Sequence, residues 1–340
     1  MARVLVTGAT GFIAGHVILK LLEAGHDVRG TARSVSRAKP LNTILGDFAG
    51  HPVSIEIVEA DLNSDEGWVE AAAGMDYVQH VASPFPATIP KDADELIRPA
   101  RDGALRVLKA AKAAGVKRVV MTSSMAAIAY GWGERRPNPL TEDHWSDPDN
   151  LKDNTAYTRS KTIAERAAWD YVNGEGQGLE LAVINPSAVL GPVMSNDLSG
   201  SLEIITQLMT GKVPASPRVG FCVVDVRDVA DAHYQAMVRP EAAGERFLAA
   251  GRFMWMEDVA DVLRVNFPDY RKKLPKGVLP DWLLRAITLV NPPARQLIPE
   301  LGRERHCSNE KARQVLGWAP RAEEDAIIEG AQSLVDLNVI

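Results

Sequence analysis

A tyrosine and a lysine four residues apart have the types and spacing needed for acid–base chemistry. Tyr157 and Lys161 stand at i and i+4, so a helix would place them on one face, one turn apart. An ammonium about 4 Å from a phenol, at an effective dielectric constant of ~20, stabilises the phenolate by roughly 4 kcal/mol. That energy corresponds to about three pKa units, and desolvation of a buried phenolate opposes it. The spacing therefore predicts a tyrosine whose pKa its lysine lowers toward neutrality.

A serine at the end of a predicted strand adds a third polar group. The residues TSS at 122–124 follow the apolar run 118–121, and open α/β sheets bind ligands at the carboxyl ends of their strands. Ser124 would hold the oxygen of a substrate carbonyl group, and Tyr157 would give that oxygen a proton while hydride adds to the carbon. Lys161 would also hydrogen-bond the nicotinamide ribose. We predict these three residues as the catalytic group.

A glycine-rich turn near residue 10 predicts a nucleotide-binding site. Gly8, Gly11 and Ala14 lie between a strand-like run at 4–6 and a helical stretch at 12–24. Gly8 allows a sharp turn, Gly11 allows the main chain to approach a ligand, and Ala14 allows the helix to pack on the strand. The N-terminus of that helix suits a pyrophosphate. The spacing departs from the commonest fingerprint, Gly-x-Gly-x-x-Gly, and a plain tight turn is the alternative.

The end of the second predicted strand favours NADP(H) over NAD(H). An NAD-binding domain has Asp or Glu there, about 20 residues after the glycine turn. This chain has VRGTARS at 28–34. A guanidinium binds phosphate through paired hydrogen bonds, so Arg33 indicates the 2′-phosphate of NADP(H), with a solvated basic loop as the alternative. Asp61 and Leu62, just after the third predicted strand, are placed to flank the adenine.

Strands and helices alternate along the first half of the chain. Runs at 4–6, 53–58, 77–81, 118–121 and 181–184 indicate strands, and 12–24 and 96–114 indicate helices. This alternation predicts an α/β fold, a doubly wound parallel-sheet Rossmann fold with helices on both faces. Prolines interrupt the pattern after residue 190. We predict an NADP(H)-binding domain at 1–190, with 220–240 returning to it, and a smaller, mostly helical, interleaved substrate-binding lobe at 191–340.

Composition excludes several classes of function. The 340 residues include 38 Lys and Arg and 44 Asp and Glu, a net charge of −6, which argues against a nucleic-acid partner. Two cysteines cannot form a disulfide framework, and the 7 histidines lack metal-ligand spacing, so we expect no metal. We find no membrane-spanning apolar run, and we expect no signal peptide because a strand-and-turn pattern starts within the first residues. We expect a cytoplasmic monomer or homodimer acting on a small-molecule carbonyl or alcohol substrate.

Together the motifs resemble those of the extended short-chain dehydrogenases/reductases, and within them the dihydroflavonol reductase-like group of NADPH-dependent carbonyl (aldehyde) reductases. The segments carrying the resemblance are TGATGFI at 7–13, VRGTAR at 28–33, HVASP at 80–84, TSS at 122–124, YTRSK at 157–161, NPSAVLGP at 185–192, VDVRDVA at 224–230, SNEKA at 308–312 and LGW at 316–318. The resemblance implies NADPH-dependent reduction of hydrophobic or aromatic aldehydes or ketones to alcohols. A sugar-nucleotide epimerase or dehydratase, and an NADP(H)-sensing regulator without catalysis, are the alternatives.

The resemblance also implies how the cofactor is held. Arg37, favoured over Lys39, would be the second ligand of the 2′-phosphate. Pro186 and Val189 would border the nicotinamide, and Ser201 would meet the pyrophosphate. The predicted cofactor-binding residues are Gly8, Thr10, Gly11, Phe12, Ile13, Arg33, Arg37, Asp61, Leu62, Val81, Ala82, Ser83, Thr122, Tyr157, Lys161, Pro186, Val189 and Ser201.

The segments that the resemblance places around the substrate are mostly apolar. Their residues are Phe85, Met125, Ile128, Tyr130, Ile205 and Met209. The set suits a hydrophobic or aromatic carbonyl compound, with a core position as the alternative for each residue. Plant dihydroflavonol reductases have a polar residue where this chain has Ala129, so that activity is not carried over. Arg135 and Arg136 could meet an acidic substrate, but we expect them to form an exposed charged loop.

Overall fold

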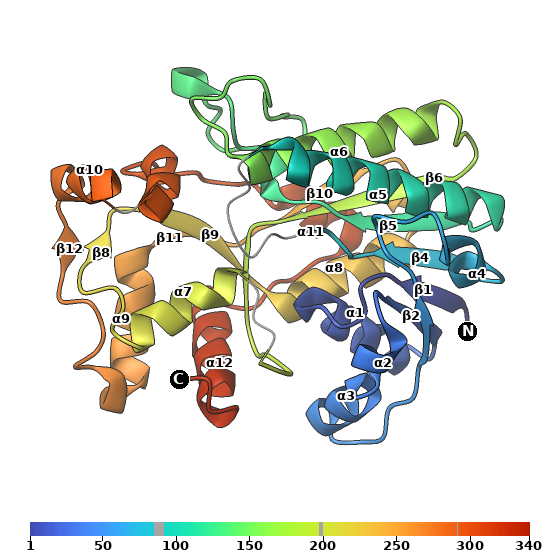
Figure 1. Cartoon of the computed structure of the whole chain (residues 1–340), viewed down its shortest axis with the longest axis horizontal. Coiled ribbons are helices and arrows are strands. Elements are labelled where there is room, and N and C mark those ends of the chain that lie inside the picture. Colours follow the sequence, from blue (N-terminus) through green and yellow to red (C-terminus); the bar gives the residue numbers. More distant parts are fainter. Residues whose placement is uncertain (85–91, 197–199, 291) are drawn as a thin grey trace.

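The computed structural model describes residues 1–84, 92–196, 200–290 and 292–340. Its main sheet has seven strands in the order β10-β6-β5-β4-β1-β2-β3, and every pairing is parallel (Figure 1). The strands are β1 (Arg3–Val6), β2 (Asp27–Ala32), β3 (Glu56–Glu59), β4 (Tyr77–His80), β5 (Arg118–Thr122), β6 (Glu180–Pro186) and β10 (Arg246–Ala249). The strand order reverses between β1 and β4, where doubly wound sheets bind ligands. The predicted fold class is confirmed.

Helices cover both faces of this sheet because its strands alternate their side chains between two cores. The helices of the large part are α1 (Phe12–Glu23), α2 (Val35–Ala38), α3 (Leu41–Ala49), α4 (Trp68–Ala72), α5 (Asp94–Ala113), α6 (Ala156–Asn173) and α8 (Val226–Val238). Val120 packs in the core beneath α1 and α8, whereas its neighbours Val119 and Met121 pack in the core beneath α4, α5 and α6. Both faces of β5 are thus buried, as expected of a central parallel strand.

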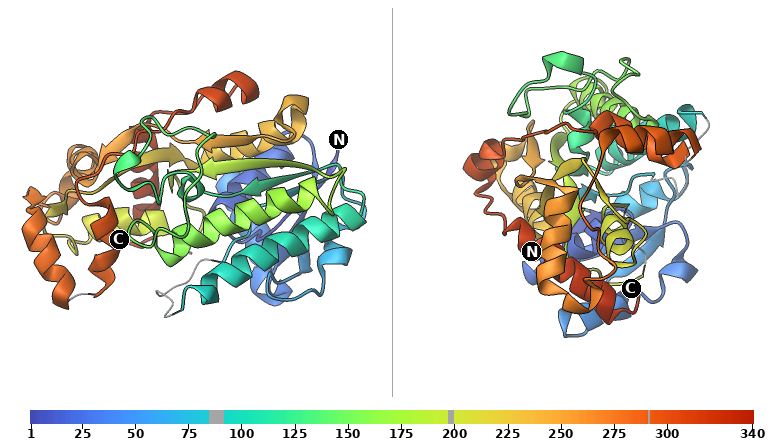
Figure 2. Two further views of the ribbon diagram at one scale, coloured as in Figure 1. Left: turned by 90° about the horizontal axis from the view of Figure 1, so that it is seen from above. Right: turned by 90° about the vertical axis from the view of Figure 1, so that its left-hand side faces the viewer.

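Most of the remaining elements form a lobe with its own apolar core at the left of Figure 1. They are β7 (Ala188–Leu190), β8 (Ser216–Pro217), β9 (Gly220–Asp225), β11 (Phe253–Trp255), β12 (Val278–Leu279), α7 (Gly200–Met209), α9 (Met256–Asn266), α10 (Asp281–Val290) and α12 (Glu323–Asp336), with the turn η4 (Pro268–Tyr270) and the longer η5 (Pro292–Glu300). Helix α11 (Glu310–Leu316) and the turn η3 (Pro240–Ala242) pack instead in the core beneath α1 and α8. The turn η1 (Met125–Ala127) contacts α6, and η2 (Gly133–Arg135) lies between η1 and α6 in the chain. β7, β9 and β11 make a second sheet, and β8 pairs with β12. Figure 2 shows the lobe beyond one end of the main sheet.

The chain returns to the main sheet beyond the predicted segment 220–240. Its seventh strand is β10, at 246–249, which pairs with β6. We therefore propose the same two parts, a nucleotide-binding domain and a substrate-binding lobe, and we add strand β10 to the nucleotide-binding domain. Among the described residues, no helix is both long and apolar enough to cross a bilayer.

Candidate active site

Ser124, Tyr157 and Lys161 meet at the carboxyl edge of the main sheet. Ser124 directly follows Ser123 at the end of β5 and caps η1, with its hydroxyl accepting from the amide of Ala126 at 3.1 Å. A hydrogen bond joins the side chains of Ser124 and Tyr157. The ammonium of Lys161 lies 5.8 Å from the centroid of the Tyr157 ring. The structure thus brings the three predicted catalytic side chains together.

The start of helix α6 sets the position of Tyr157. Thr155 caps this helix and its hydroxyl accepts from the amide of Thr158 at 3.2 Å, while the hydroxyl of Thr158 accepts from the amide of Thr155 at 2.8 Å. Such a capping box satisfies two of the amides that a helix start leaves free. Tyr157 therefore stands in a well-defined first turn, and Lys161 follows one turn later.

Burial governs the titration of both residues. It raises the pKa of Tyr157, against the smaller effect of the hydrogen bond with Ser124, and it lowers the pKa of Lys161 to about 8, against the opposing charge of Glu165. The prediction that Lys161 brings the pKa of Tyr157 toward neutrality is therefore wrong for this structure. Desolvation of the buried phenol has the largest effect, and the ammonium of Lys161 is directed to Ser83.

A buried carboxylate beneath the site escaped the sequence analysis. Glu165 is fully buried and accepts hydrogen bonds from the Ser123 hydroxyl at 2.5 Å and from the Asn185 amide at 2.7 Å. The Asn185 amide also donates to the Ser124 carbonyl at 3.1 Å. Arg246 forms an ion pair with Glu165 at 2.8 Å. Glu165 thus supports the strand end that carries Ser124. Its position four residues after Lys161 is the one signal the sequence offered.

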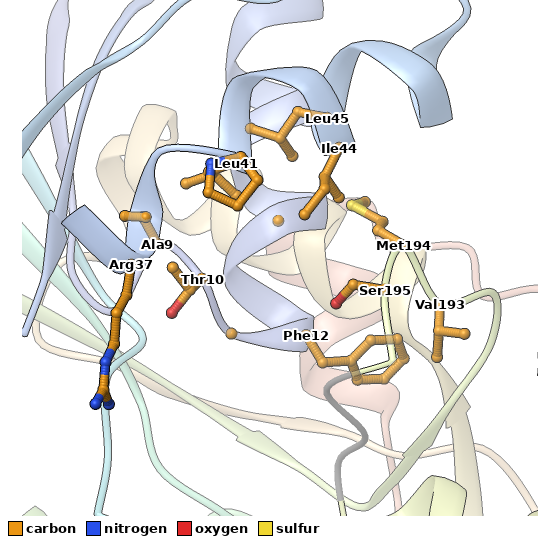
Figure 3. Close-up of a pocket in the computed structure, with 14 residues that line it drawn as sticks. Ala9, Thr10, Phe12, Arg37, Leu41, Ile44, Leu45, Val193, Met194 and Ser195 are labelled. Atoms are coloured by element: carbon orange, nitrogen blue, oxygen red, sulfur yellow. The ribbon is translucent and has the colours of Figure 1, made fainter. Parts of the chain in front are cut away.

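The glycine turn and helix α1 form one wall of a cavity of about 130 Å³. Gly8 has φ +66°, and a Cβ atom there would stand 3.0 Å from that of Ala82, so the turn requires glycine. Gly11 precedes the first residue of α1. Thr10, Phe12 and Arg37 are drawn with the other lining residues in Figure 3. The open turn, the helix N-terminus and the guanidinium fit a dinucleotide phosphate.

Only some of the candidate phosphate ligands line this cavity. Arg33, Arg37 and Lys39 are all exposed, but only Arg37 lines the cavity; Arg33, directly after β2, and Lys39 are not among its lining residues. Ser195 also lines the cavity (Figure 3), and Ser201, in the first turn of α7, does not. Ser195 was missed because the sequence around it carries no recognisable motif.

The other predicted cofactor residues lie at or near the carboxyl edge of the main sheet, and some of them use their side chains in hydrogen bonds within the protein. The Thr122 hydroxyl is hydrogen-bonded to His233 at 2.9 Å in the interior. Thr122 would therefore contact a cofactor through its main-chain atoms. Asp61 accepts from the amide of Asn63 at 2.9 Å. Val81, Ala82 and Ser83 directly follow β4, Leu62 follows Asp61, Ile13 is in the first turn of α1, Pro186 ends β6 and Val189 lies in β7.

The predicted substrate contacts divide into two groups. Met125 and Tyr130 keep part of their surface exposed. Ile128, Ile205 and Met209 are fully buried in apolar cores and present no surface to a ligand, so their prediction as substrate contacts is corrected to core positions. The cause is that Ile205 and Met209 share the face of α7 that packs in the lobe. Phe85 lies outside the described residues.

A doubly wound sheet with Ser124, Tyr157 and Lys161 beside a glycine turn defines a nicotinamide-dependent oxidoreductase of the Rossmann class. Residues 4–250 match the model of the NAD dependent epimerase/dehydratase family. The chain belongs to this family, the extended short-chain dehydrogenases/reductases, and is an NAD(P)-dependent oxidoreductase.

Similar proteins include reductases from plants and yeast. Tetraketide alpha-pyrone reductase 2 of Arabidopsis thaliana is 36% identical over 276 residues, covering 79% of this chain and 84% of that protein. Cinnamoyl-CoA reductase 1 of Petunia hybrida is 37% identical over 269 residues, covering 78% of each. The structure of yeast methylglyoxal/isovaleraldehyde reductase Gre2 complexed with NADPH has a TM-score of 0.80 and 28% identity, covering 99% of both chains.

Proposed function

We propose that this chain is an NADPH-dependent carbonyl reductase that converts hydrophobic or aromatic aldehydes or ketones to alcohols, acting in the cytoplasm as a monomer or homodimer. The observation that carries the proposal is the meeting of Ser124, Tyr157 and Lys161 at the sheet edge that also holds the glycine turn. The names of the similar proteins, three reductases of which one is complexed with NADPH, support it.

Each catalytic residue has a task that its surroundings favour. NADPH, when bound, supplies the hydride for the carbonyl carbon. The Ser124 hydroxyl donates a hydrogen bond to the carbonyl oxygen and holds it beside the phenol. Tyr157 donates its proton to that oxygen, and burial favours this task because it keeps the phenol protonated at neutral pH. The Lys161 ammonium stabilises the phenolate that remains after the proton has left.

We further propose that the cofactor lies along the glycine turn with its 2′-phosphate between Arg33 and Arg37. Arg37 shares the cavity with Thr10 and Gly11, and Arg33 leaves the adjacent strand at its carboxyl end. The main-chain amides at the start of α1 hold the pyrophosphate. In this arrangement Ser195 is the serine of the lobe that faces the cofactor, in place of Ser201.

The direct test is NADPH consumption with a panel of aldehydes, ketones and sugar nucleotides. We expect the absorbance of NADPH to fall with aldehydes or ketones and not in the Tyr157→Phe variant. Interconversion of a sugar nucleotide without net NADPH consumption would instead identify an epimerase. Tight NADPH binding with no turnover of any carbonyl compound would identify a regulator and refute the reductase.

A further inference from the structure

Three arginines converge on one buried carboxylate next to the proposed active site. Asp153, four residues before Tyr157, lies 2.8 Å from Arg303, 3.6 Å from Arg305 and 3.5 Å from Arg136. Arg136 follows η2, whereas Arg303 and Arg305 follow η5. The two segments are adjacent, because the Leu140 amide donates to the His306 carbonyl at 2.8 Å.

The carboxylates around these arginines do not neutralise all of their positive charge. Glu300 pairs with Arg305, so three guanidinium groups face two carboxylates. Asp153 also accepts from the amide of Gly131 at 3.2 Å. The pKa of Arg136 is lowered, mainly by burial and secondly by repulsion from Arg305. Such repulsion is expected where guanidinium groups outnumber carboxylates.

The Nε atoms of Arg136 and of Arg305 are buried without a hydrogen-bond acceptor. The Nη2 atoms of both residues have only Asp153 as a partner, at the ion-pair distances of 3.5 and 3.6 Å. Side-chain exposure is 14% for Arg136 and 3% for Arg305, so water reaches neither group freely. Because buried donors in folded proteins nearly always have partners, and because the cluster carries excess positive charge, the complementary group is an anion with several acceptor oxygens.

Tyr130 connects the cluster to the proton donor. The guanidinium carbon of Arg305 stands 4.4 Å from the centroid of the Tyr130 ring. Burial raises the pKa of Tyr130, and Arg305, Tyr157, Asp153 and Arg136 all lie near enough to act on its hydroxyl electrostatically. Tyr130 therefore packs against Arg305 and lies within electrostatic range of Tyr157, which links the arginine cluster to the proposed active site.

We propose that Arg136 and Arg305 form an anion subsite, and that the substrate is an aldehyde or ketone whose apolar body ends in a carboxylate or phosphate. Asp153 and Glu300 hold the two guanidinium groups in place, and the planar fork of each matches the oxygens of such an anion. This inference rests on the proposed function and narrows its substrate class. It corrects the expectation of an exposed Arg135–Arg136 loop, since Arg135 is exposed and Arg136 is not.

The first experiment compares matched substrates with the wild-type enzyme and NADPH. The probes are 4-carboxybenzaldehyde, 4-formylphenyl phosphate and the neutral methyl 4-formylbenzoate. A charge-assisted hydrogen bond predicts kcat/KM values at least about tenfold higher for one or both anionic aldehydes than for the ester. The larger of the two ratios identifies carboxylate or phosphate. Reduction of the ester without preference for either anion would overturn the subsite and leave the reductase intact.

The second experiment uses two neighbouring variants with the same change in charge. Arg136→Gln should lower the anion-to-ester ratio of kcat/KM by about tenfold. Arg135→Gln, at an exposed position, should leave the ratio unchanged within about twofold. Equal effects of the two variants would show that only general charge matters and would refute the subsite. If Arg136→Gln fails to fold, the wild-type comparison decides.

A binding measurement separates failure of the subsite from failure of the proposed function. The NADPH-loaded wild-type protein is titrated with benzene-1,4-dicarboxylate, which carries no reducible carbonyl, in a calorimeter. We expect heat of binding that is lost in Arg136→Gln and kept in Arg135→Gln. If no aldehyde is reduced, the reductase fails while this binding still reports the subsite. Absence of binding in the wild-type protein, together with no substrate preference, refutes the subsite.

Discussion

The ammonium of Lys161 donates a hydrogen bond to the hydroxyl of Ser83, 2.8 Å away. Lys161 lies on α6 and Ser83 follows β4, so this bond joins the helix that carries Tyr157 to the strand bordering the reversal of strand order. The bond also stabilises the charged form of Lys161, whose pKa burial lowers to about 8.

Activity should therefore fall as the pH rises through about 8, the pKa of Lys161. Below this pKa the lysine carries the charge that stabilises the phenolate of Tyr157, and above it the charge is lost. Ser83→Ala removes a hydrogen bond to the charged form, so the fall in kcat/KM should begin at lower pH in this variant. A pH–rate profile unchanged by Ser83→Ala would contradict this assignment.

Tyr157→Phe should lower kcat by at least ~10², the usual contribution of general acid catalysis. The variant loses the proton donor and its hydrogen bond with Ser124 while keeping the ring. NADPH affinity, measured by fluorescence titration, should stay close to that of the wild type. Tyr171→Phe, near the other end of the same helix, is the matched control and should keep full activity. Near wild-type turnover by Tyr157→Phe would remove this tyrosine from its role.

Two adjacent serines should respond in different ways to alanine. Ser124→Ala should reduce turnover strongly, because its hydroxyl is hydrogen-bonded to Tyr157 at the site, and should lower the free energy of unfolding by about 1 kcal/mol, because the hydroxyl also caps η1. Ser123→Ala should keep more activity and lower the free energy of unfolding by about 1–3 kcal/mol, since the buried Glu165 loses a donor. Turnover and denaturant unfolding of both variants measure the two effects. The reverse order of turnover would show that Ser123 is the catalytic serine.

The arginines after β2 should determine the choice between NADPH and NADH. Arg37→Ala and Arg33→Ala should each weaken NADPH binding by about 10-fold or more, the effect of losing a charge-assisted phosphate contact, and should barely change NADH binding. Lys39→Ala, at an exposed position that does not line the cavity, is the control. Dissociation constants for both cofactors test this prediction. Equal losses for NADPH and NADH would contradict the 2′-phosphate assignment.

The protein should lose stability as the pH falls below about 6.5, partly because of His233. Burial lowers its pKa from 6.5 to about 3, so below pH 6.5 the unfolded chain binds a proton that the folded chain excludes. At pH 5 this difference costs about 2 kcal/mol. The destabilisation by His233→Gln, measured by denaturant unfolding, should therefore shrink by about that amount between pH 7 and pH 5.

His51→Gln serves as the comparison, because His51 is exposed. Its small effect on the free energy of unfolding should be the same at both pH values. An effect of His233→Gln that does not change with pH would show that His233 is not kept neutral by burial. The hydrogen bonds of His233 to Thr122 and Gln79 explain why its replacement is expected to destabilise the protein at pH 7.

The local pattern of the sequence was sufficient for the fold class and for the residues proposed as the catalytic group. Strand-like runs alternating with helical spacing predict a parallel sheet, because each element is specified by its own periodicity. Gly8, Gly11 and Ala14 predict the turn, since the backbone conformation and close packing there require small residues. The i, i+4 spacing of Tyr157 and Lys161 similarly places both on one helix face.

Only the tertiary structure decided which faces of these elements meet and which groups lose water. Local spacing cannot distinguish a pocket residue from a core residue, so Ile128, Ile205 and Met209 were misplaced. It also could not separate the largely covered side chain of Arg136 from that of exposed Arg135, or place Glu165 under the proposed catalytic serine, because those relations join segments far apart in the chain. The pKa of Tyr157 was misjudged for the same reason, since desolvation depends on everything packed around the phenol.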